Sequence, residues 1–327
     1  MLFRSHSKFT VLHPVINTAL ASAQGQIPYH RLPLLEARAR ARQAYPAKPM
    51  PVSVAGVHDM QTTGGVHAIP LRVYHPPGMG PHPVLMFFHG SGFVLLDLDT
   101  HDDLCRRLCA GAGCVVVSVD YRLAPEHPFP AAPDDCLAAT RWVALHAAEL
   151  GVDPMRLAVA GDSAGGCLAA VTAIRIRDEG GPAVCAQLLF YPVIDHPGAG
   201  HASYRDFGIG YGLTEEGMQW FWSQYLTAPA LAGHPHAAPA QVASAVNLPS
   251  AYVATAEYDV LRDEGEAFAK LLRDACVPVV SQRCAGMNHG FLKYTGTIPE
   301  VDRFLADACQ WLRTACQSTS IHPTVTP

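Results

Sequence analysis

A serine among closely spaced glycines, in GDSAGG at residues 161–166, is the feature of the sequence that most directly suggests chemistry. It follows an apolar run at 156–160 and precedes a helical pattern over 164–177. A serine on a sharp strand-to-helix turn presents its hydroxyl above the edge of a sheet, and glycines around it relieve the steric crowding. The pattern therefore predicts that Ser163 is a nucleophile for acyl transfer.

A serine nucleophile needs a base, and the base needs an acid that orients it. With this kind of turn the order along the chain is serine, acid, histidine. Asp259 follows an apolar run at 251–256, and His289 follows the next run at 279–283, with room for one strand–helix–strand unit between them. We therefore predict Asp259 as the acid and His289 as the base.

Other residues compete for both roles. The chain has 17 histidines, so a single histidine means little, but His289 stands out because Gly290 follows it in a loop between a strand and a helix. Three nearby carboxylates remain alternatives for the acid, the first of them the strongest: Glu257, Asp263 and Glu264.

A glycine-rich turn, HGSGF at 89–93, follows the apolar run at 84–88. Such a turn can direct backbone N–H groups at a developing oxyanion, and the N–H of the residue after the nucleophile completes the set. The predicted donors are the N–H groups of Gly90, Ser91 and Ala164.

These residues need a scaffold, and short apolar runs alternating with helical patterns predict a mostly parallel sheet with right-handed crossovers. Strands are expected at 66–75, 84–88, 115–119, 156–160, 187–191, 251–256 and 279–283, the first of them antiparallel and half-buried. Helices are expected at 100–110, 133–150, 164–177, 264–275 and 300–316, with Thr100 as an N-cap and Gly151 ending the second.

Two stretches interrupt this alternation. Residues 1–50 have a helical pattern without strands, and 195–247 is rich in glycine, proline, histidine and aromatic residues. The second stretch is predicted either as a lid or as a solvated loop with one packed helix. Residues 317–327 have little apolar content and are predicted to form a flexible tail.

Composition excludes several functional classes. With 49% hydrophobic and 16% charged residues, the chain can bury a large core. A net charge of −5 without a basic cluster argues against a nucleic-acid surface, and no apolar run approaches the roughly 20 residues that cross a bilayer.

The cysteines and the N-terminal residues indicate the cellular compartment in which the protein is expected. None of the ten cysteines forms Cys-x-x-Cys, so most are predicted to be small buried groups in a reducing, cytoplasmic environment. Residues 1–23 loosely imitate a signal peptide, but His13, Pro14 and Asn17 interrupt the apolar region, which favours a helical segment.

Five motifs together resemble the bacterial hormone-sensitive-lipase-like (family IV) carboxylesterases of the α/β-hydrolase fold. They are HGSGF at 89–93, DYRLAPEHPFPA at 120–131, GDSAGG at 161–166, DVLRDEG at 259–265 and HGF at 289–291. The second and fourth are long and specific, and the resemblance runs from about residue 11 to residue 315.

The resemblance implies an α/β-hydrolase fold with about eight mostly parallel strands, helices on both faces and a helical cap. It implies that residues 1–50 form the N-terminal part of the cap, and that 51–316 form the catalytic domain. Within that domain, 195–247 would contain a second cap insertion.

The same resemblance implies a serine carboxylesterase with Ser163, Asp259 and His289 as nucleophile, acid and base. It would hydrolyse carboxylic esters of short to medium acyl chains through an acyl-enzyme, without a metal or a cofactor. The Tyr-Arg-Leu-Ala-Pro run at 121–125 would shape the loop beside the oxyanion turn.

The sequence departs from the family at one position. The family usually has three glycines after His89, and the middle one is Ser91 here. The backbone N–H is retained, but a positive φ at a non-glycine residue would cost about 1–2 kcal/mol. The hydroxyl could add a donor or narrow the acyl pocket, and we expect Ser91→Gly to change kcat only modestly.

The sequence supports the alternatives to a short-chain esterase to different degrees. Lactones, amides, carbamates and longer-chain lipids can be cleaved by the same machinery. A nucleotide site is disfavoured because no phosphate-binding glycine motif occurs, and a non-catalytic ligand-binding protein because all three triad candidates are present. The expected partner is a small ester, and the chain is expected to be a monomer or an edge-paired homodimer.

Overall fold

The computed structural model describes residues 11–48 and 50–317. The strands are β1 Gly56–Gln61, β2 Pro70–His75, β3 His82–Phe88, β4 Val115–Val119, β5 Val152–Asp162, β6 Val184–Phe190, β7 Ser250–Tyr258 and β8 Val279–Asn288. The α-helices are α1 Pro14–Ser22, α2 Leu34–Gln43, α3 Asp102–Ala112, α4 Ala131–Leu145, α5 Ala164–Glu179, α6 Ala202–Phe207, α7 Glu215–Tyr225, α8 Arg262–Asp274 and α9 Pro299–Gln317. Short 3₁₀ helices are η1 Tyr29–Arg31, η2 Asp99–His101, η3 Pro197–Ala199, η4 Pro229–Gly233, η5 Pro239–Gln241 and η6 Phe291–Tyr294.

The strands of the described residues form one eight-stranded sheet in the order β1-β2-β4-β3-β5-β6-β7-β8. β2 pairs antiparallel with β1 and β4, whereas the pairs from β4 through β8 are parallel. This confirms the predicted mostly parallel sheet of about eight strands. Because the parallel strands end at one edge, the loops that follow β3, β5, β7 and β8 meet there.

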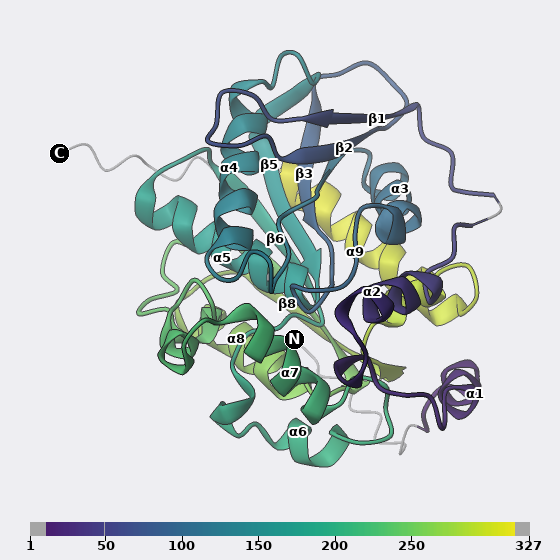
Figure 1. Ribbon diagram of the computed structural model, residues 1–327. Helices are drawn as coiled ribbons and strands as arrows, with labels where there is room; N and C mark the ends of the chain where they lie inside the picture. Colours follow the sequence, from purple (N-terminus) through teal and green to yellow (C-terminus); the bar gives the residue numbers. More distant parts are fainter. Residues whose placement is uncertain (1–10, 49, 318–327) are drawn as a thin grey trace.

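Helices cover both faces of the sheet (Figure 1). In β3, Met86 and Phe88 point into the core on the side of α4, α5 and α8, whereas Leu85 and Phe87 point into the core beside α3 and α9. All four side chains are fully buried. Burying each large apolar side chain stabilises the fold by about 1.5–3 kcal/mol, so this two-sided packing holds the strand rigidly.

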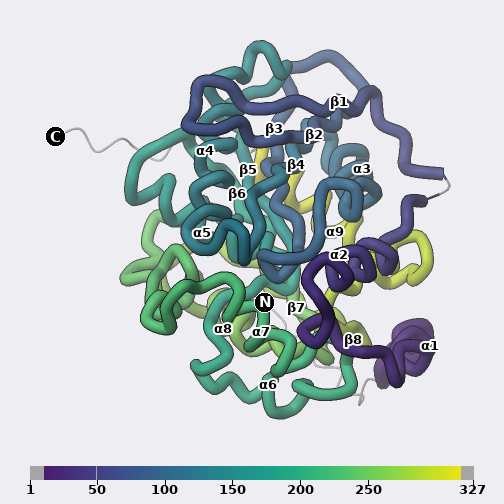
Figure 2. Tube along the Cα trace, in the orientation of Figure 1, coloured from purple at the N-terminus to yellow at the C-terminus, as the bar shows by residue number. Residues whose placement is uncertain are grey.

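The segment at 195–247 holds two α-helices, α6 and α7, rather than the single helix of one prediction. Trp222 and Tyr225 of α7 are buried, so this helix is packed rather than solvated. In Figures 1 and 2, α6 and α7 lie in the lower half of the view with α1 and α2. Glu216 of α7 joins this segment to the N-terminal one through a 3.1 Å contact with His30 and a 3.1 Å ion pair with Arg31.

Several predicted boundaries were wrong. β1 was not predicted, because GVHDMQ at 56–61 has little apolar character, and the strand expected from residue 66 begins only at Pro70. α4 ends at Leu145, and turns fill the stretch before Gly151.

The start of α3 and the end of β8 also differ. Thr100 lies in η2, where its hydroxyl accepts from the backbone N–H of Asp97, so it does not cap α3. β8 runs five residues beyond its predicted end, to Asn288, and therefore delivers His289 directly from a strand.

The cysteines are free thiols, and eight of the ten are buried, as predicted for most of them. No helix among the described residues is long and apolar enough to cross a membrane. The tail predicted at 317–327 lies outside the described residues, apart from Gln317 at the end of α9.

Candidate active site

Ser163 sits on the turn between β5 and α5 with φ 56° and ψ −121°, a conformation that a non-glycine residue rarely adopts. A Cβ on Gly161 would lie 2.2 Å from the carbonyl oxygen of Gly165, and one on Gly165 would lie 1.8 Å from that of Phe88. Only glycine fits at these two positions. The Ser163 N–H donates to the Phe190 carbonyl at 2.9 Å, which ties the strained turn to the end of β6.

The structure brings His289 and Asp259 to this serine. His289 Nε2 lies 2.8 Å from Ser163 Oγ, and His289 Nδ1 lies 2.8 Å from Asp259 Oδ2. The other Asp259 oxygen accepts from the N–H of Leu261 at 3.0 Å. Since an ionised carboxylate can only accept, Nδ1 carries the proton and Nε2 is free to accept from the serine hydroxyl.

The three alternative carboxylates are engaged elsewhere. Glu257 Oε2 accepts from the N–H of Gly286 at 2.7 Å, and Asp263 Oδ2 accepts from the N–H of Ser203 at 2.9 Å. Glu264 is fully buried, and this burial raises its pKa well above the usual value.

The predicted N–H donors of the oxyanion hole differ in whether they already have an acceptor within the protein. The N–H of Gly90 donates to Asp162 Oδ1 at 2.7 Å, so it is already used within the protein. By contrast, the N–H groups of Ser91, Gly92 and Ala164 donate to no acceptor in residues 11–48 and 50–317. Gly92 thus replaces Gly90 among the groups that could receive an oxyanion.

Ser91 does not have the backbone strain considered for it. The positive φ angles of this turn fall on Gly92, at 57°, and Phe93, at 65°. The Ser91 hydroxyl lies 2.8 Å from the hydroxyl of Tyr121, which itself donates to the His89 carbonyl at 2.6 Å. Because Tyr121 has one proton to give, Ser91 is the donor of the first bond, and its hydroxyl braces the turn.

The motif that begins at Asp120 supports this turn from beneath, as expected. The Tyr121 ring stacks on the His89 ring at 4.4 Å between centroids, and the Ala124 N–H donates to the Phe93 carbonyl at 2.9 Å. Burial lowers the pKa of His89 to about 3, so its imidazole is neutral.

Asp162 is a negatively charged residue beneath the oxyanion turn, directly before the nucleophile. It is buried, which by itself favours the neutral acid, yet His101 at 3.2 Å and the Gly90 N–H hold its pKa below the usual value. The ionised carboxylate fixes the backbone of the oxyanion turn next to the nucleophile.

Comparisons with known proteins give a consistent result. The alpha/beta hydrolase fold family matches residues 85–293. The esterase LipI of Mycobacterium tuberculosis is 41% identical over 295 residues, covering 88% of this chain and 91% of LipI. The ethyl acetate hydrolase of Pseudomonas putida is 39% identical over 250 residues, covering 75% of this chain and 78% of that protein. A thermostable esterase from Pseudomonas putida ECU1011 has a crystal structure with a TM-score of 0.90 at 39% identity, covering 94% of this chain and 98% of that one.

The chain belongs to the α/β-hydrolase family. Within this family it falls in the hormone-sensitive-lipase-like esterase branch that its motifs resemble.

Sequence reasoning missed three features of this α/β-hydrolase: the N–H of Gly92, the Asp162–His101 pair and the Ser91–Tyr121 hydrogen bond. Gly92 and Asp162 lie inside the glycine-rich motifs, so the sequence marked both residues. It did not show where the Gly92 N–H and the Asp162 carboxylate point. His101 had no local signal, because its pairing with Asp162 depends on how η2 packs against the sheet edge.

Proposed function

We propose that this α/β-hydrolase is a serine carboxylesterase that hydrolyses carboxylic esters of short to medium acyl chains through an acyl-enzyme. The observation that carries the proposal is the chain of two 2.8 Å contacts from Ser163 through His289 to Asp259. Two of its relatives, the esterase LipI of Mycobacterium tuberculosis and the ethyl acetate hydrolase of Pseudomonas putida, support ester hydrolysis.

Acylation begins when Ser163 Oγ attacks the ester carbonyl carbon and His289 Nε2 takes the hydroxyl proton. Asp259 holds His289 in the correct tautomer and stabilises the imidazolium that forms. As the tetrahedral intermediate collapses, the bond to the alcohol oxygen breaks and His289 gives the proton to the leaving alcohol. The acyl group then remains on Ser163 as an ester.

Deacylation repeats these steps with water. His289 takes a proton from the water as its oxygen attacks the acyl carbon, and returns the proton to Ser163 Oγ when the carboxylic acid leaves. In both halves the oxyanion accepts from the N–H groups of Ser91, Gly92 and Ala164. Ala164 is the first residue of α5, where the helix dipole adds a favourable positive potential.

The proposed cap comprises residues 1–50, of which 1–10 and 49 lie outside the described residues, and 195–247, on a catalytic domain of 51–316. Phe221 of α7 supports a restricted acyl space: a Cβ on Gly92 would lie 2.3 Å from its ring, so the helix rests on the oxyanion turn. Aromatic packing of α7 against this turn, including Phe93 and Tyr225 stacked at 3.9 Å, would limit long acyl chains.

A series of p-nitrophenyl esters from acetate to palmitate tests the proposal. We expect turnover that peaks at short to medium chains, and a fall of about 10³-fold or more in kcat for Ser163→Ala with an unchanged circular dichroism spectrum. No turnover of any ester by the wild type would overturn the proposed function. A maximum at palmitate would overturn the chain-length part alone.

A further inference from the structure

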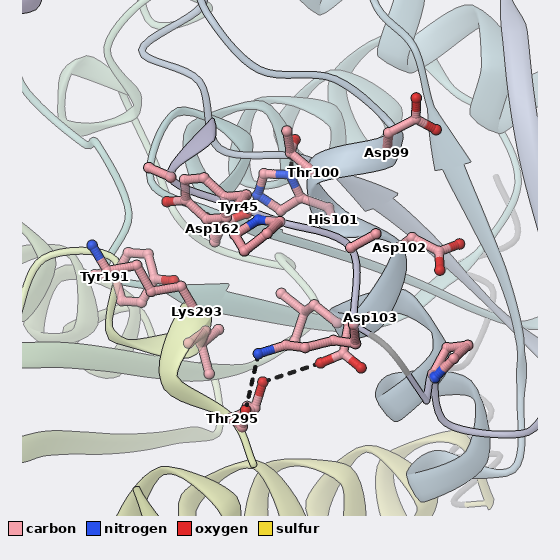
Figure 3. A pocket seen from close by; sticks show the side chains of 17 residues that line it. Tyr45, Asp99, Thr100, His101, Asp102, Asp103, Asp162, Tyr191, Lys293 and Thr295 are labelled. Carbon is pink, nitrogen blue, oxygen red and sulfur yellow. Dashed lines mark hydrogen bonds and ion pairs between the residues drawn. The ribbon is translucent and has the colours of Figure 1, made fainter. Parts of the chain in front are cut away.

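A cavity of about 190 Å³ lies beside the triad. Most of its wall comes from three places far apart in the sequence: residues 44–48 after α2, 99–104 in η2 and the first turn of α3, and 292–295 around η6. Figure 3 shows Tyr45, His101 and Asp162 together on one wall, with Lys293 and Thr295 below them in the view.

The cavity borders the residues that hold the nucleophile and the base. Asp162 lines it and immediately precedes Ser163, and consecutive Cα atoms are about 3.8 Å apart. Tyr191 also lines it, and its ring contacts the His289 ring edge-on at 5.0 Å. Ser163 and His289 do not themselves line the cavity, so a substrate held at Ser163 would reach it past Asp162 and Tyr191.

The aspartates on the cavity wall have cationic or imidazole partners. Asp162 pairs with His101, and the three aspartates in η2 and the first turn of α3 pair with arginines. These pairs are Asp99–Arg72 at 2.8 Å, with Arg72 shared with Asp59 at 2.6 Å, Asp102–Arg106 at 2.7 Å and Asp103–Arg107 at 2.7 Å.

The two lysines on the cavity wall, by contrast, have no carboxylate partner among the described residues. Of the three lysines in the described residues, Lys48 and Lys293 line this cavity, and neither lies within ion-pair distance of a carboxylate there. Lys48 Nζ donates to the Thr295 carbonyl at 3.5 Å, and Lys293 Nζ lies 5.1 Å from the centroid of the Tyr294 ring. The third, Lys270, pairs with Asp274 on the surface of α8.

Lys293 as a whole is exposed to solvent, but partial burial of its ammonium lowers its pKa, and no carboxylate among the described residues lies within ion-pair distance to offset that loss. An anion in the cavity would do so through charge-assisted hydrogen bonds. The volume corresponds to about six water molecules, which suits a small group. The neighbouring aspartates, although paired, disfavour a doubly charged ligand such as phosphate and favour a single carboxylate.

We propose that this cavity binds a carboxylate on the substrate, so that the enzyme prefers esters in which the acyl or the alcohol arm ends in a carboxylate. The proposal rests on the proposed function, because it names the substrate class of the same site. Lys48 and Lys293 are substrate-binding residues in this account and take no part in the proton transfers.

Two pairs of isosteric esters test it, each differing in one charge. On the acyl side they are mono-p-nitrophenyl succinate and p-nitrophenyl 4-oxopentanoate. On the alcohol side they are acetoxyacetate and acetoxyacetone, followed by titration of the released acid. We expect the anionic member of at least one pair to have the higher kcat/KM, and this preference to weaken as salt is added.

Lysine variants locate the effect. In Lys48→Met combined with Lys293→Met, we expect kcat/KM for the preferred anionic ester to fall about tenfold or more, mainly through KM, and the neutral isostere to change less than about twofold. Lys48→Arg with Lys293→Arg should retain the preference. Lys270→Met is the matched control, because it removes a lysine remote from the cavity, and it should leave both esters unchanged.

The outcomes separate the two proposals. Turnover of the neutral esters without a preference for the anionic ones overturns the carboxylate site but not the proposed esterase activity. An equal loss of kcat/KM for both members of a pair in the double variant has the same meaning. No turnover of any ester overturns both. Free succinate distinguishes a substrate subsite from a separate effector site: competitive inhibition that the double variant loses supports the proposal, and inhibition that is not competitive contradicts it.

Discussion

Ser163 and Ser91 follow two neighbouring parallel strands, β5 and β3, and both lie in glycine-rich turns at the same edge of the sheet. Ser163 itself has the positive φ of its turn, and its hydroxyl faces His289. Ser91 has an ordinary φ, because Gly92 and Phe93 take the positive values, and its hydroxyl donates to Tyr121.

The difference shows that a serine in a glycine-rich turn has no fixed role. What separates the two is which residue bears the strained dihedral angle and which partner the hydroxyl meets. At Ser163 the strain lifts the side chain toward an imidazole, which makes it a candidate nucleophile. At Ser91 the side chain is turned into the protein, and only the backbone N–H is left to act on a substrate.

Alanine at each position should give the largest contrast. We expect Ser163→Ala to lower kcat by about 10³-fold or more, because no other hydroxyl among the described residues bonds His289 Nε2. Ser91→Ala loses one hydrogen bond of about 1 kcal/mol and should lower kcat by less than about tenfold. Steady-state kinetics on p-nitrophenyl butyrate measure both, and effects of similar size would break the comparison.

The acids near Ser163 offer the next contrast. Asp259→Asn should lower kcat by about 10³-fold, because an amide no longer fixes the His289 tautomer or stabilises the imidazolium. Glu257→Gln is the matched control, since its side-chain oxygen can still accept from the Gly286 N–H, and we expect a change of less than about threefold. A large loss in the glutamine variant would instead favour Glu257 as the acid.

The hydrogen bonds of Tyr121 and Ser91 that hold the oxyanion turn predict a smaller effect on kcat, in which the two residues are coupled. Tyr121→Phe removes the donor to the His89 carbonyl and the acceptor for Ser91, so kcat should fall about three- to tenfold with KM little changed. Adding Ser91→Ala to this variant should lower kcat little further, because the shared bond is already absent. Independent, multiplicative losses would show that the two hydroxyls do not act together.

Stability provides the smallest predicted effect. Glu264 Oε1 accepts from the Ile194 N–H at 2.8 Å, beside Val193, whose N–H donates to the Ser163 carbonyl. Burial raises the Glu264 pKa well above its usual 4.5, so the folded protein keeps a proton that the unfolded chain releases as pH rises through that value. The unfolded state then binds fewer protons, and stability from this group falls with increasing pH.

Glu264→Gln keeps an accepting oxygen and has no proton to lose. The free energy of unfolding of this variant should therefore increase relative to that of wild type as pH is raised from about 4 to 8, which means that the variant becomes relatively more stable. Urea denaturation at several pH values measures this difference. A difference that does not vary with pH would mean that Glu264 is not protonated in the folded protein.

Residues at strand ends were largely predictable. The motifs place Ser163, Asp259 and His289 after apolar runs, and a parallel sheet brings the ends of such runs together whatever their separation in the chain. The alternative acids could not be eliminated from sequence, because Glu257 and Asp259 both end the same strand region. Only the three-dimensional course of the loop shows which carboxylate faces the imidazole.

Other features depend on contacts that no local pattern records. The direction of the Gly90 N–H is set by the Asp162 carboxylate, which approaches from a neighbouring strand. Lys48 and Lys293 are isolated lysines in the sequence, and they come to one cavity only because the chain after α2 packs against η6. Tertiary packing, rather than propensity, decides such features.

The most direct test of the central claim is active-site labelling with a p-nitrophenyl alkylphosphonate, which transfers its phosphonyl group to an activated serine and releases p-nitrophenolate. The account predicts one equivalent of p-nitrophenolate per chain and one adduct, located at Ser163 by peptide mass spectrometry. Labelling should persist in Ser91→Ala and be lost in Ser163→Ala. An adduct on Ser91, or undiminished labelling of Ser163→Ala, would contradict the assignment of Ser163 as the nucleophile.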